Sequence, residues 1–353
     1  MEMVFRWFGE ENDHIPLAHI QQIPGVKGVV WSLHNKVAGE KWSTDDIKEL
    51  QQQVDPYNLH IEVVESVNIH EDIKLGLPTR DKYIENYIET IQELSKVGVK
   101  VICYNFMPVF DWIRTDLFKE LPDGSTALFY EKQLIEGNDP SELVERVMKD
   151  ENFTLPGWEP ERMEQLSEIL EAYKKVDEEM LWDNLKYFLE AVIPVAEKYN
   201  IKLAIHPDDP PWPVFGLPRI VINAENLGRV LELVDSPSNG LTFCSGSLGA
   251  NPANDLPAII RRYADKIHFA HVRNLKRFDN GDFIETSHKM SDGSVDMFGI
   301  MKAFHEVGYT GYIRPDHGRH IWDEVCRPGY GLYDRALGIM YLWGIWDSLE
   351  QTK

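Results

Sequence analysis

The sequence predicts a single (β/α)8 barrel over residues 1–353, with a long helical insertion between its fourth and fifth strands. Eight short β-rich runs recur along the chain, and amphipathic helical patterns separate them. Several of these runs are almost wholly apolar, as strands buried on both faces of a parallel sheet should be. The chain length suits one barrel with an insertion. A doubly wound open sheet is the alternative arrangement of the same alternation.

Branched apolar side chains indicate the positions of the expected strands. Val63-Val64 and Val101-Ile102 form the centres of two of them, and such residues favour the extended backbone. The eight expected strands cover residues 5–8, 28–33, 60–66, 99–106, 202–206, 241–245, 266–272 and 312–316.

The expected helices fill the gaps between these strands. Ser43 precedes one of them as a capping residue, ahead of the apolar positions Ile47 and Leu50. Residues 83–97 place apolar side chains on one helical face. The remaining helices are expected over residues 181–199, 223–233, 256–263, 297–307 and 334–349.

The connection between the fourth and fifth strands is too long for a simple loop. It covers about residues 109–178 and carries helical patterns near residues 141–150 and 160–173. Long connections in compact domains are often functional. We expect a helical insertion that lies over the barrel mouth and belongs to the same domain.

Composition excludes some classes of partner. The formal net charge of −22 opposes a nucleic-acid groove, which needs a basic surface, and an anionic membrane surface. Three widely spaced cysteines do not form a disulfide framework and suit a reducing compartment. The first residues show no secretory signal, and no apolar run approaches a membrane span. We therefore expect a cytoplasmic protein that binds neither nucleic acid nor membrane.

Four of the expected strands end in a residue that can bind a metal. These residues are His206, Cys244, His271 and Asp316, at spacings that fit a strand, a helix and loops. A parallel barrel gathers the carboxyl ends of its strands around one mouth, so the four side chains should converge there. Imidazole, thiolate and carboxylate groups hold divalent transition metals. A lone nucleophilic Cys244 is the alternative, but its position among other ligand types favours metal binding.

The segment around Asp316 carries further candidates. His317 follows Asp316 directly, and past the end of a strand both neighbours can reach the mouth. Arg314 and Arg319 could hold an anionic substrate by bidentate contacts, although each alone is more often a surface ion pair.

Other polar residues near strand ends have weaker assignments. Asp208 could orient His206, or it could be a solvated turn residue. By strand alternation His268 lies opposite to His271, so it is left out as a ligand. Glu65 and Glu71 follow the third strand, but acidic residues are too common in this chain to assign either one.

A set of distinctive segments runs from end to end of the sequence. They are Phe5-Arg6-Trp7-Phe8-Gly9, Gln22-Ile23-Pro24-Gly25-Val26, Val64-Glu65-Ser66-Val67, His70-Glu71-Asp72-Ile73-Lys74-Leu75-Gly76, Tyr104-Asn105-Phe106-Met107-Pro108-Val109-Phe110-Asp111-Trp112, His206-Pro207-Asp208-Asp209-Pro210-Pro211, Phe243-Cys244-Ser245-Gly246-Ser247, His268-Phe269-Ala270-His271-Val272-Arg273-Asn274, Arg314-Pro315-Asp316-His317-Gly318 and Pro328-Gly329-Tyr330. In these segments the chain resembles the D-mannonate dehydratase family, within the xylose-isomerase-like barrel superfamily.

The resemblance implies a reaction and a set of roles. D-mannonate would lose water to give 2-keto-3-deoxy-D-gluconate, without a redox cofactor. His206, Cys244, His271 and Asp316 would hold a divalent metal. His317 and Tyr330 would transfer protons, with the choice of base and acid left open. Tyr330 has no signal of its own in the sequence.

The metal and the partners follow in the same way. The ligand set by itself is typical of zinc, whereas the family implies Mn²⁺, with Fe²⁺ or Co²⁺ as substitutes and Zn²⁺ as an occupant that inhibits. We expect a homodimer acting on a small sugar acid. The alternatives are an aldose–ketose isomerase on the same barrel and a non-catalytic sugar-acid-binding protein.

Overall fold

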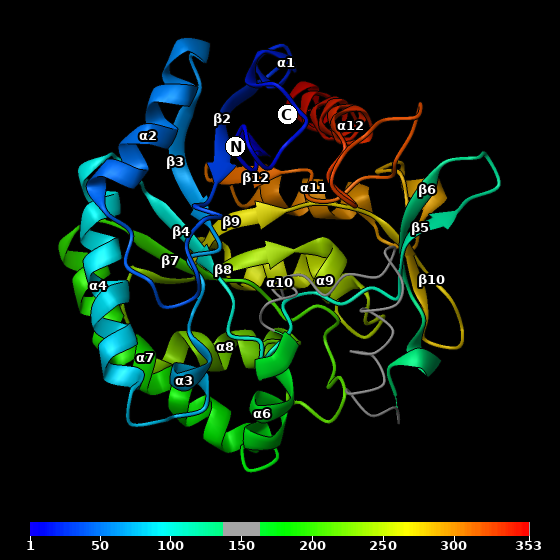
Figure 1. The fold of residues 1–353 in the computed structure, drawn as a ribbon. Helices are drawn as coiled ribbons and strands as arrows, with labels where there is room; N and C mark the ends of the chain where they lie inside the picture. Colours follow the sequence, from blue (N-terminus) through cyan, green and yellow to red (C-terminus); the bar gives the residue numbers. More distant parts are fainter. Residues whose placement is uncertain (137–162, 353) are drawn as a thin grey trace.

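The computed structural model, which describes residues 1–136 and 163–352, is built around a closed barrel of eight parallel strands (Figure 1). Neighbouring strands follow the order β1-β2-β3-β4-β7-β8-β9-β12, and β12 closes the barrel onto β1. These strands confirm the predicted barrel, and each overlaps one of the eight predicted runs. Their bounds are Glu2–Arg6, Val26–Trp31, His60–Glu65, Val101–Tyr104, Lys202–Ile205, Asn239–Cys244, Ile267–His271 and Tyr312–Arg314.

Alternation along the strands separates two apolar regions. Val30 and Val63 point into the barrel, where they belong to a small inner cluster with Val4, Val101 and Phe269. Their chain neighbours pack outward against the helices in a much larger cluster. The strands are therefore buried on both faces, which explains their nearly continuous apolar sequences.

Helices surround the barrel where the sequence predicts them (Figure 1). Ser43 caps α2: its hydroxyl accepts from the Asp46 backbone N–H, and the Asp46 carboxylate accepts from the Ser43 N–H. The long helices are α2 (Thr44–Val54), α4 (Arg80–Lys96), α6 (Met163–Tyr173), α7 (Glu178–Lys198), α8 (Ala224–Leu233), α10 (Leu256–Arg262), α11 (Met297–Glu306) and α12 (Leu332–Gln351). The short helices are α1 (Leu17–Gln21), α3 (Glu71–Lys74) and α9 (Ser245–Gly249), with 3-10 turns at Asp55–Tyr57, Lys132–Leu134, Ala264–Lys266 and Met290–Asp292.

The insertion between β4 and β7 is not only helical. It contains a hairpin of β5 (Asp116–Glu120) and β6 (Thr126–Tyr130), which the prediction of helices alone did not include. The hairpin turns at Asp123-Gly124, where Gly124 takes a φ of +81°. The predicted helix over residues 160–173 is observed as α6, whereas the one over residues 141–150 lies outside the described residues.

The hairpin joins a second small sheet. Strand β6 pairs antiparallel with β11 (Phe283–Glu285), which in turn pairs with β10 (Leu275–Arg277) from the segment after β9. Two long connections of the barrel thus share one four-stranded sheet, in the order β10-β11-β6-β5.

The end of the insertion is tied to the loop after β3. The Tyr173 hydroxyl on α6 donates to the Glu71 carboxylate at 2.5 Å, and Lys74 pairs with the same carboxylate at 2.7 Å. Glu71 therefore has a structural role in holding α6 against the barrel.

Within residues 1–136 and 163–352, none of the helices has the length and apolar character that a bilayer crossing requires.

Candidate active site

The four predicted metal ligands converge at the carboxyl ends of their strands. Ligand atoms of His206, Cys244 and His271 all lie within 4.8 Å of one another. Asp316 completes the cluster, since its Oδ1 lies 3.6 Å from His271 Nδ1 and its Oδ2 lies 3.5 Å from Cys244 Sγ. Residues at or just past the ends of four different strands therefore surround one point in the barrel mouth.

The backbone at Asp316 explains how two neighbours reach the same site. Strand β12 ends at Arg314, and Asp316 takes a φ of +60° in the left-handed region. A non-glycine residue holds this conformation only where its surroundings enforce it, and such residues cluster at functional sites. The turn places both Asp316 and His317 in the buried interior, at 2% and 3% exposure.

The candidate ligand atoms lie at separations similar to those around a divalent ion. His206 Nε2 lies 3.1 Å from His271 Nδ1. Bonds of about 2.0–2.3 Å around a tetrahedral ion place ligand atoms roughly 3.3–3.8 Å apart, close to the separations found here. His206 Nδ1 lies 2.7 Å from the Pro207 carbonyl, and His271 Nε2 lies 3.5 Å from Glu65 Oε2. Both outer nitrogens thus face acceptors. With their hydrogens on these outer nitrogens, the two rings would turn lone pairs toward each other, and a shared cation would stabilise that arrangement.

Several donors point at the sulfur of Cys244. The backbone N–H and the hydroxyl of Ser247 point at its sulfur, at 3.4 and 3.1 Å, from the first turn of α9. Arg273 Nη1 lies 3.6 Å from the same atom. A thiolate is the form that binds a metal.

Buried arginines keep the carboxylates of this region charged. Asp316 pairs with Arg273 and, at 2.9 Å, with Arg314. Burial opposes ionisation of Asp316, but these two guanidinium groups outweigh it and hold the pKa of the carboxyl well below its usual range. Arg314 also pairs with Glu65 at 2.9 Å. This arginine, considered above as a contact for an anionic substrate, is therefore already paired with carboxylates of the protein.

His317 and Tyr330 form a direct pair beside the ligand cluster. His317 Nε2 lies 3.0 Å from the Tyr330 hydroxyl oxygen, and the two rings meet edge to face. Burial lowers the pKa of His317 and raises the pKa of Tyr330 to about 12. At neutral pH the pair therefore consists of a neutral imidazole and a protonated phenol.

Glu285 was not predicted from the sequence, although it contacts His317. It is the last residue of β11, and its Oε1 lies 3.3 Å from His317 Nδ1. The same carboxylate pairs with Arg114 of the insertion at 2.7 Å and with Arg273 at 3.0 Å. No local motif marks Glu285; only the hairpin turn at Asp123-Gly124 hints at the sheet that places it.

Asp209 was not predicted from the sequence either; only its neighbour Asp208 was considered as a site residue. Asp209 accepts two hydrogen bonds from Arg114 and one from Arg273 at 2.7 Å. Asp208 accepts from the backbone N–H groups of Ile220 and Val221 at 2.7 and 3.0 Å. The prediction of a solvated turn residue was therefore wrong, because Asp208 is buried. Its hydrogen bonds hold the following loop, and none joins it to His206 within the described residues.

Arg319 lies outside the site. Its guanidinium binds Asp334 at 2.9 Å and Asp123 at 3.1 Å, so the surface ion-pair alternative is the observed one. His268, which strand alternation excluded as a ligand, packs beside Gly240, where no Cβ is present to displace its ring.

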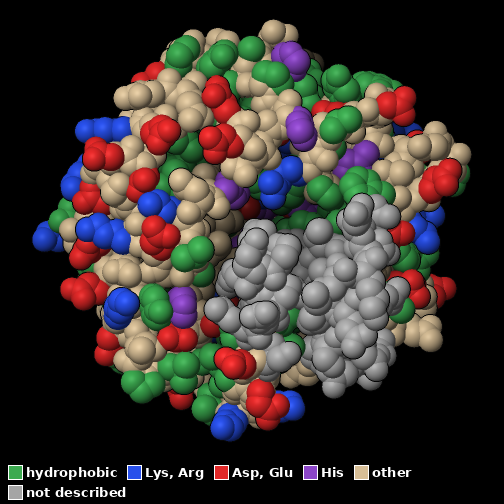
Figure 2. All heavy atoms as spheres, in the orientation of Figure 1, with side chains coloured by type: hydrophobic (Ala, Val, Ile, Leu, Met, Phe, Trp, Pro, Cys, Tyr) green, Lys and Arg blue, Asp and Glu red, His purple; other side chains and the backbone are tan. Residues whose placement is uncertain are grey.

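Figure 2 shows histidine and cationic side chains beside a hollow in a face that is otherwise rich in acidic groups.

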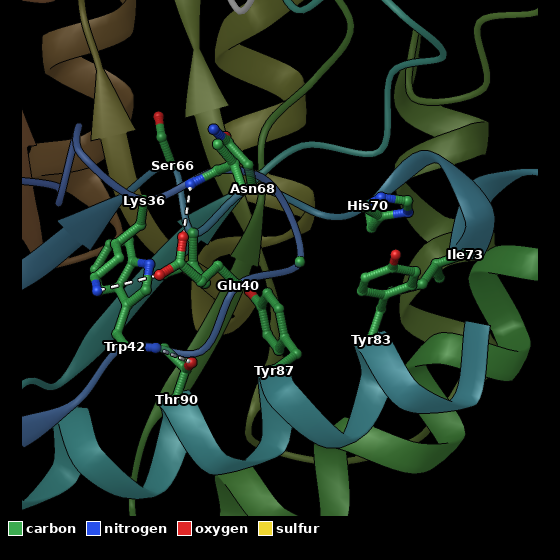
Figure 3. A pocket seen from close by; sticks show the side chains of 13 residues that line it. Lys36, Glu40, Trp42, Ser66, Asn68, His70, Ile73, Tyr83, Tyr87 and Thr90 are labelled. Carbon is green, nitrogen blue, oxygen red and sulfur yellow. Dashed lines mark hydrogen bonds and ion pairs between the residues drawn. The ribbon is translucent and has the colours of Figure 1, made fainter. Parts of the chain in front are cut away.

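A separate small pocket lies between the loops after β2 and β3 and helix α4 (Figure 3). Its polar groups bind one another: Lys36 pairs with Glu40 at 3.2 Å, and the backbone N–H of Trp42 donates to Thr90 Oγ1 at 3.1 Å. None of the predicted ligands lines this pocket. This pocket is therefore distinct from the cluster of predicted ligands.

Comparison with known proteins identifies the family of this chain. The family model of D-mannonate dehydratase (UxuA) matches residues 1–353. Mannonate dehydratase 1 of Halalkalibacterium halodurans is 66% identical over 100% of this chain and 98% of its own length. Mannonate dehydratase 1 of Bacillus licheniformis is 65% identical over 100% of this chain and 97% of its own length.

Solved structures extend the comparison to the fold. A mannonate dehydratase from Streptococcus suis superposes with a TM-score of 0.89 at 41% identity, over 100% of this chain and 94% of that one. A xylose isomerase domain protein from Planctomyces limnophilus, at 13% identity and a TM-score of 0.56 over 99% and 98% of the two chains, shares the barrel alone. The chain belongs to the D-mannonate dehydratase family.

Proposed function

We propose that this protein removes water from D-mannonate to give 2-keto-3-deoxy-D-gluconate. Family membership supports the activity, and the observation that carries the mechanism is the 3.0 Å contact between His317 and Tyr330 beside four convergent metal ligands. Dehydration needs one group that removes the C2 proton and another that protonates the departing C3 hydroxyl. A neutral imidazole and a protonated phenol supply this pair, and each positioned group contributes on the order of 10²–10⁴ in rate.

The family and the donor set indicate a divalent metal, which His206, Cys244, His271 and Asp316 would hold. Bound there, such an ion acts as a Lewis acid on the negative charge that develops beside the substrate carboxylate. We propose Mn²⁺ as the active ion, with Fe²⁺ or Co²⁺ as substitutes. The thiolate and imidazoles also suit Zn²⁺, which we expect to bind and to inhibit.

The insertion serves the same reaction. The Trp112 ring meets the His317 ring edge to face, at 5.4 Å between centroids, and Arg114 reaches Glu285 and Asp209. We propose that the insertion shields the reactive enediolate from water at the barrel mouth. The protein is also proposed to act as a homodimer.

A direct assay tests the proposed reaction. Protein loaded with Mn²⁺ is incubated with D-mannonate, and the 2-keto-3-deoxy acid is measured. Its formation is the expected result. Conversion of an aldose to a ketose without the keto acid would identify an isomerase instead, and saturable binding of D-mannonate without turnover would identify a binding protein.

A further inference from the structure

We infer that Glu285 is a positioning residue, which fixes the tautomer of His317 so that Nε2 is the nitrogen that accepts a proton. The inference rests on the proposed function for its kinetic consequences. Its structural part rests on a chain of three groups, because Glu285 Oε1 lies 3.3 Å from His317 Nδ1 and His317 Nε2 lies 3.0 Å from the Tyr330 oxygen.

Glu285 is held as a charged acceptor. Its side chain is buried, and two guanidinium groups hold it: Arg114 Nη2 lies 2.7 Å from Oε1, and Arg273 Nε lies 3.0 Å from Oε2. Burial opposes ionisation of Glu285, but Arg273 and Arg114 outweigh it and lower the pKa of the carboxyl to about 2. A carboxylate in this state has no proton to donate.

The direction of both hydrogen bonds in the series Glu285–His317–Tyr330 follows from that charge. Because Glu285 can only accept, Nδ1 of His317 must carry the hydrogen. In the neutral imidazole Nε2 then has a lone pair, and the Tyr330 hydroxyl must donate to it. The Trp112 and Tyr330 rings pack edge to face against His317, so the ring is also held in place.

This order of donors assigns the two roles that the sequence left open. His317 Nε2 receives the C2 proton, and the electron pair of the C2–H bond forms the C2–C3 double bond while the C3–O bond breaks. The phenolic proton of Tyr330 joins the departing oxygen, which leaves as water. The enol product becomes the ketone, and His317 returns its proton to the Tyr330 oxygen across the 3.0 Å contact, which restores both groups.

The central experiment is Glu285→Gln, which keeps the side-chain shape but removes the charge and offers an amide donor to Nδ1. We expect kcat on D-mannonate to fall by about 100-fold or more, since a misdirected tautomer disables a general base, while KM changes by less than about threefold and metal content is unchanged. Glu285→Asp should recover part of the activity. Glu285→Gln/His317→Asn should be no slower than His317→Asn alone, because both lesions disable the same group.

Asp334→Asn is the matched control. Asp334 is also a buried carboxylate in an ion pair, with Arg319 at 2.9 Å, and no contact between it and His317 is found in the described residues. The kcat of this variant per folded molecule should stay near the wild-type value. A Glu285→Gln enzyme within about threefold of wild-type kcat, or a double variant whose loss is the product of the single losses, would overturn the inference.

A second measurement does not depend on turnover. Long-range ¹H–¹⁵N spectra of histidine-labelled protein report which imidazole nitrogen carries the hydrogen, and comparison with His317→Asn identifies the His317 signals. We expect the Nδ1–H form in the wild-type protein, and its loss in Glu285→Gln or, if that variant does not fold, in Glu285→Asp. An Nε2–H form in the wild type overturns the inference, whereas a correct tautomer without dehydration refutes only the proposed function.

Discussion

His206 Nε2 and His271 Nδ1 lie 3.1 Å apart, although 65 residues separate the two histidines in the chain. The outer nitrogen of each ring faces an acceptor, the Pro207 carbonyl or the Glu65 carboxylate. The inner nitrogens face each other, which is the arrangement that the proposed metal site needs. The first prediction concerns this arrangement.

Removing one ligand should remove metal and activity together. Cys244→Ser and His271→Ala each delete a metal bond, so bound metal, measured by elemental analysis, and turnover should both fall. Cys326→Ser, outside the ligand cluster, is the control and should keep both. Chelation should abolish turnover, and Mn²⁺ should restore it. A metal-free Cys244→Ser protein with full activity would contradict the ligand assignment.

The proton-transfer pair should be separable from metal binding. His317→Asn and Tyr330→Phe should keep the metal and still bind D-mannonate, yet lose at least about two orders of magnitude in kcat. The double variant should be far less damaged than the product of the two losses, because both residues serve one proton-transfer sequence. Steady-state kinetics with metal analysis measures this. Near-normal turnover of metal-replete His317→Asn would remove His317 from the mechanism.

A substrate with a better leaving group should distinguish base from acid. In a D-mannonate analogue with fluorine in place of the C3 hydroxyl, fluoride departs without protonation. Tyr330→Phe should therefore eliminate fluoride at a rate close to that of the wild type, while His317→Asn should remain slow, since it lacks the base. Fluoride release, followed with an ion-selective electrode, provides the measurement. The opposite pattern would exchange the two roles.

Stability should fall in mild acid, in part through a histidine outside the site. Burial lowers the pKa of His268 to about 4, from an ordinary value of 6.5. Between these two pH values the unfolded chain binds the proton and the folded chain does not, so the free energy of unfolding decreases as pH falls, by at most about 3 kcal/mol from this group. The free energy of unfolding, measured with denaturant at pH 7 and pH 4.5, should decrease less for His268→Gln than for the wild-type protein. Equal decreases in the two proteins would exclude His268 as a source.

The barrel and the convergence of the four candidate ligands were predictable because their signals are local. Runs such as Val63-Val64 mark strands buried on both faces, and a ligand at the end of such a run must lie at the mouth once the barrel closes. Glu285 and Arg114 gave no such signal. They are 171 residues apart, and their pairing depends on a small sheet whose short, partly exposed strands lack a strong pattern. Asp209 was missed because its partners come from distant segments, and nothing local distinguishes it from Asp208.

The shared sheet has a consequence for engineering. Barrel enzymes are commonly treated as a fixed frame with independently replaceable loops, each of which can be exchanged to alter specificity. Here β6, from one connection, is hydrogen-bonded to β11, from another, and the residues that support His317 come from both. A graft that transplants either connection alone into a related barrel would separate Arg114 from Glu285. The two segments therefore form one exchangeable module, and they should be moved, recombined or redesigned as a pair.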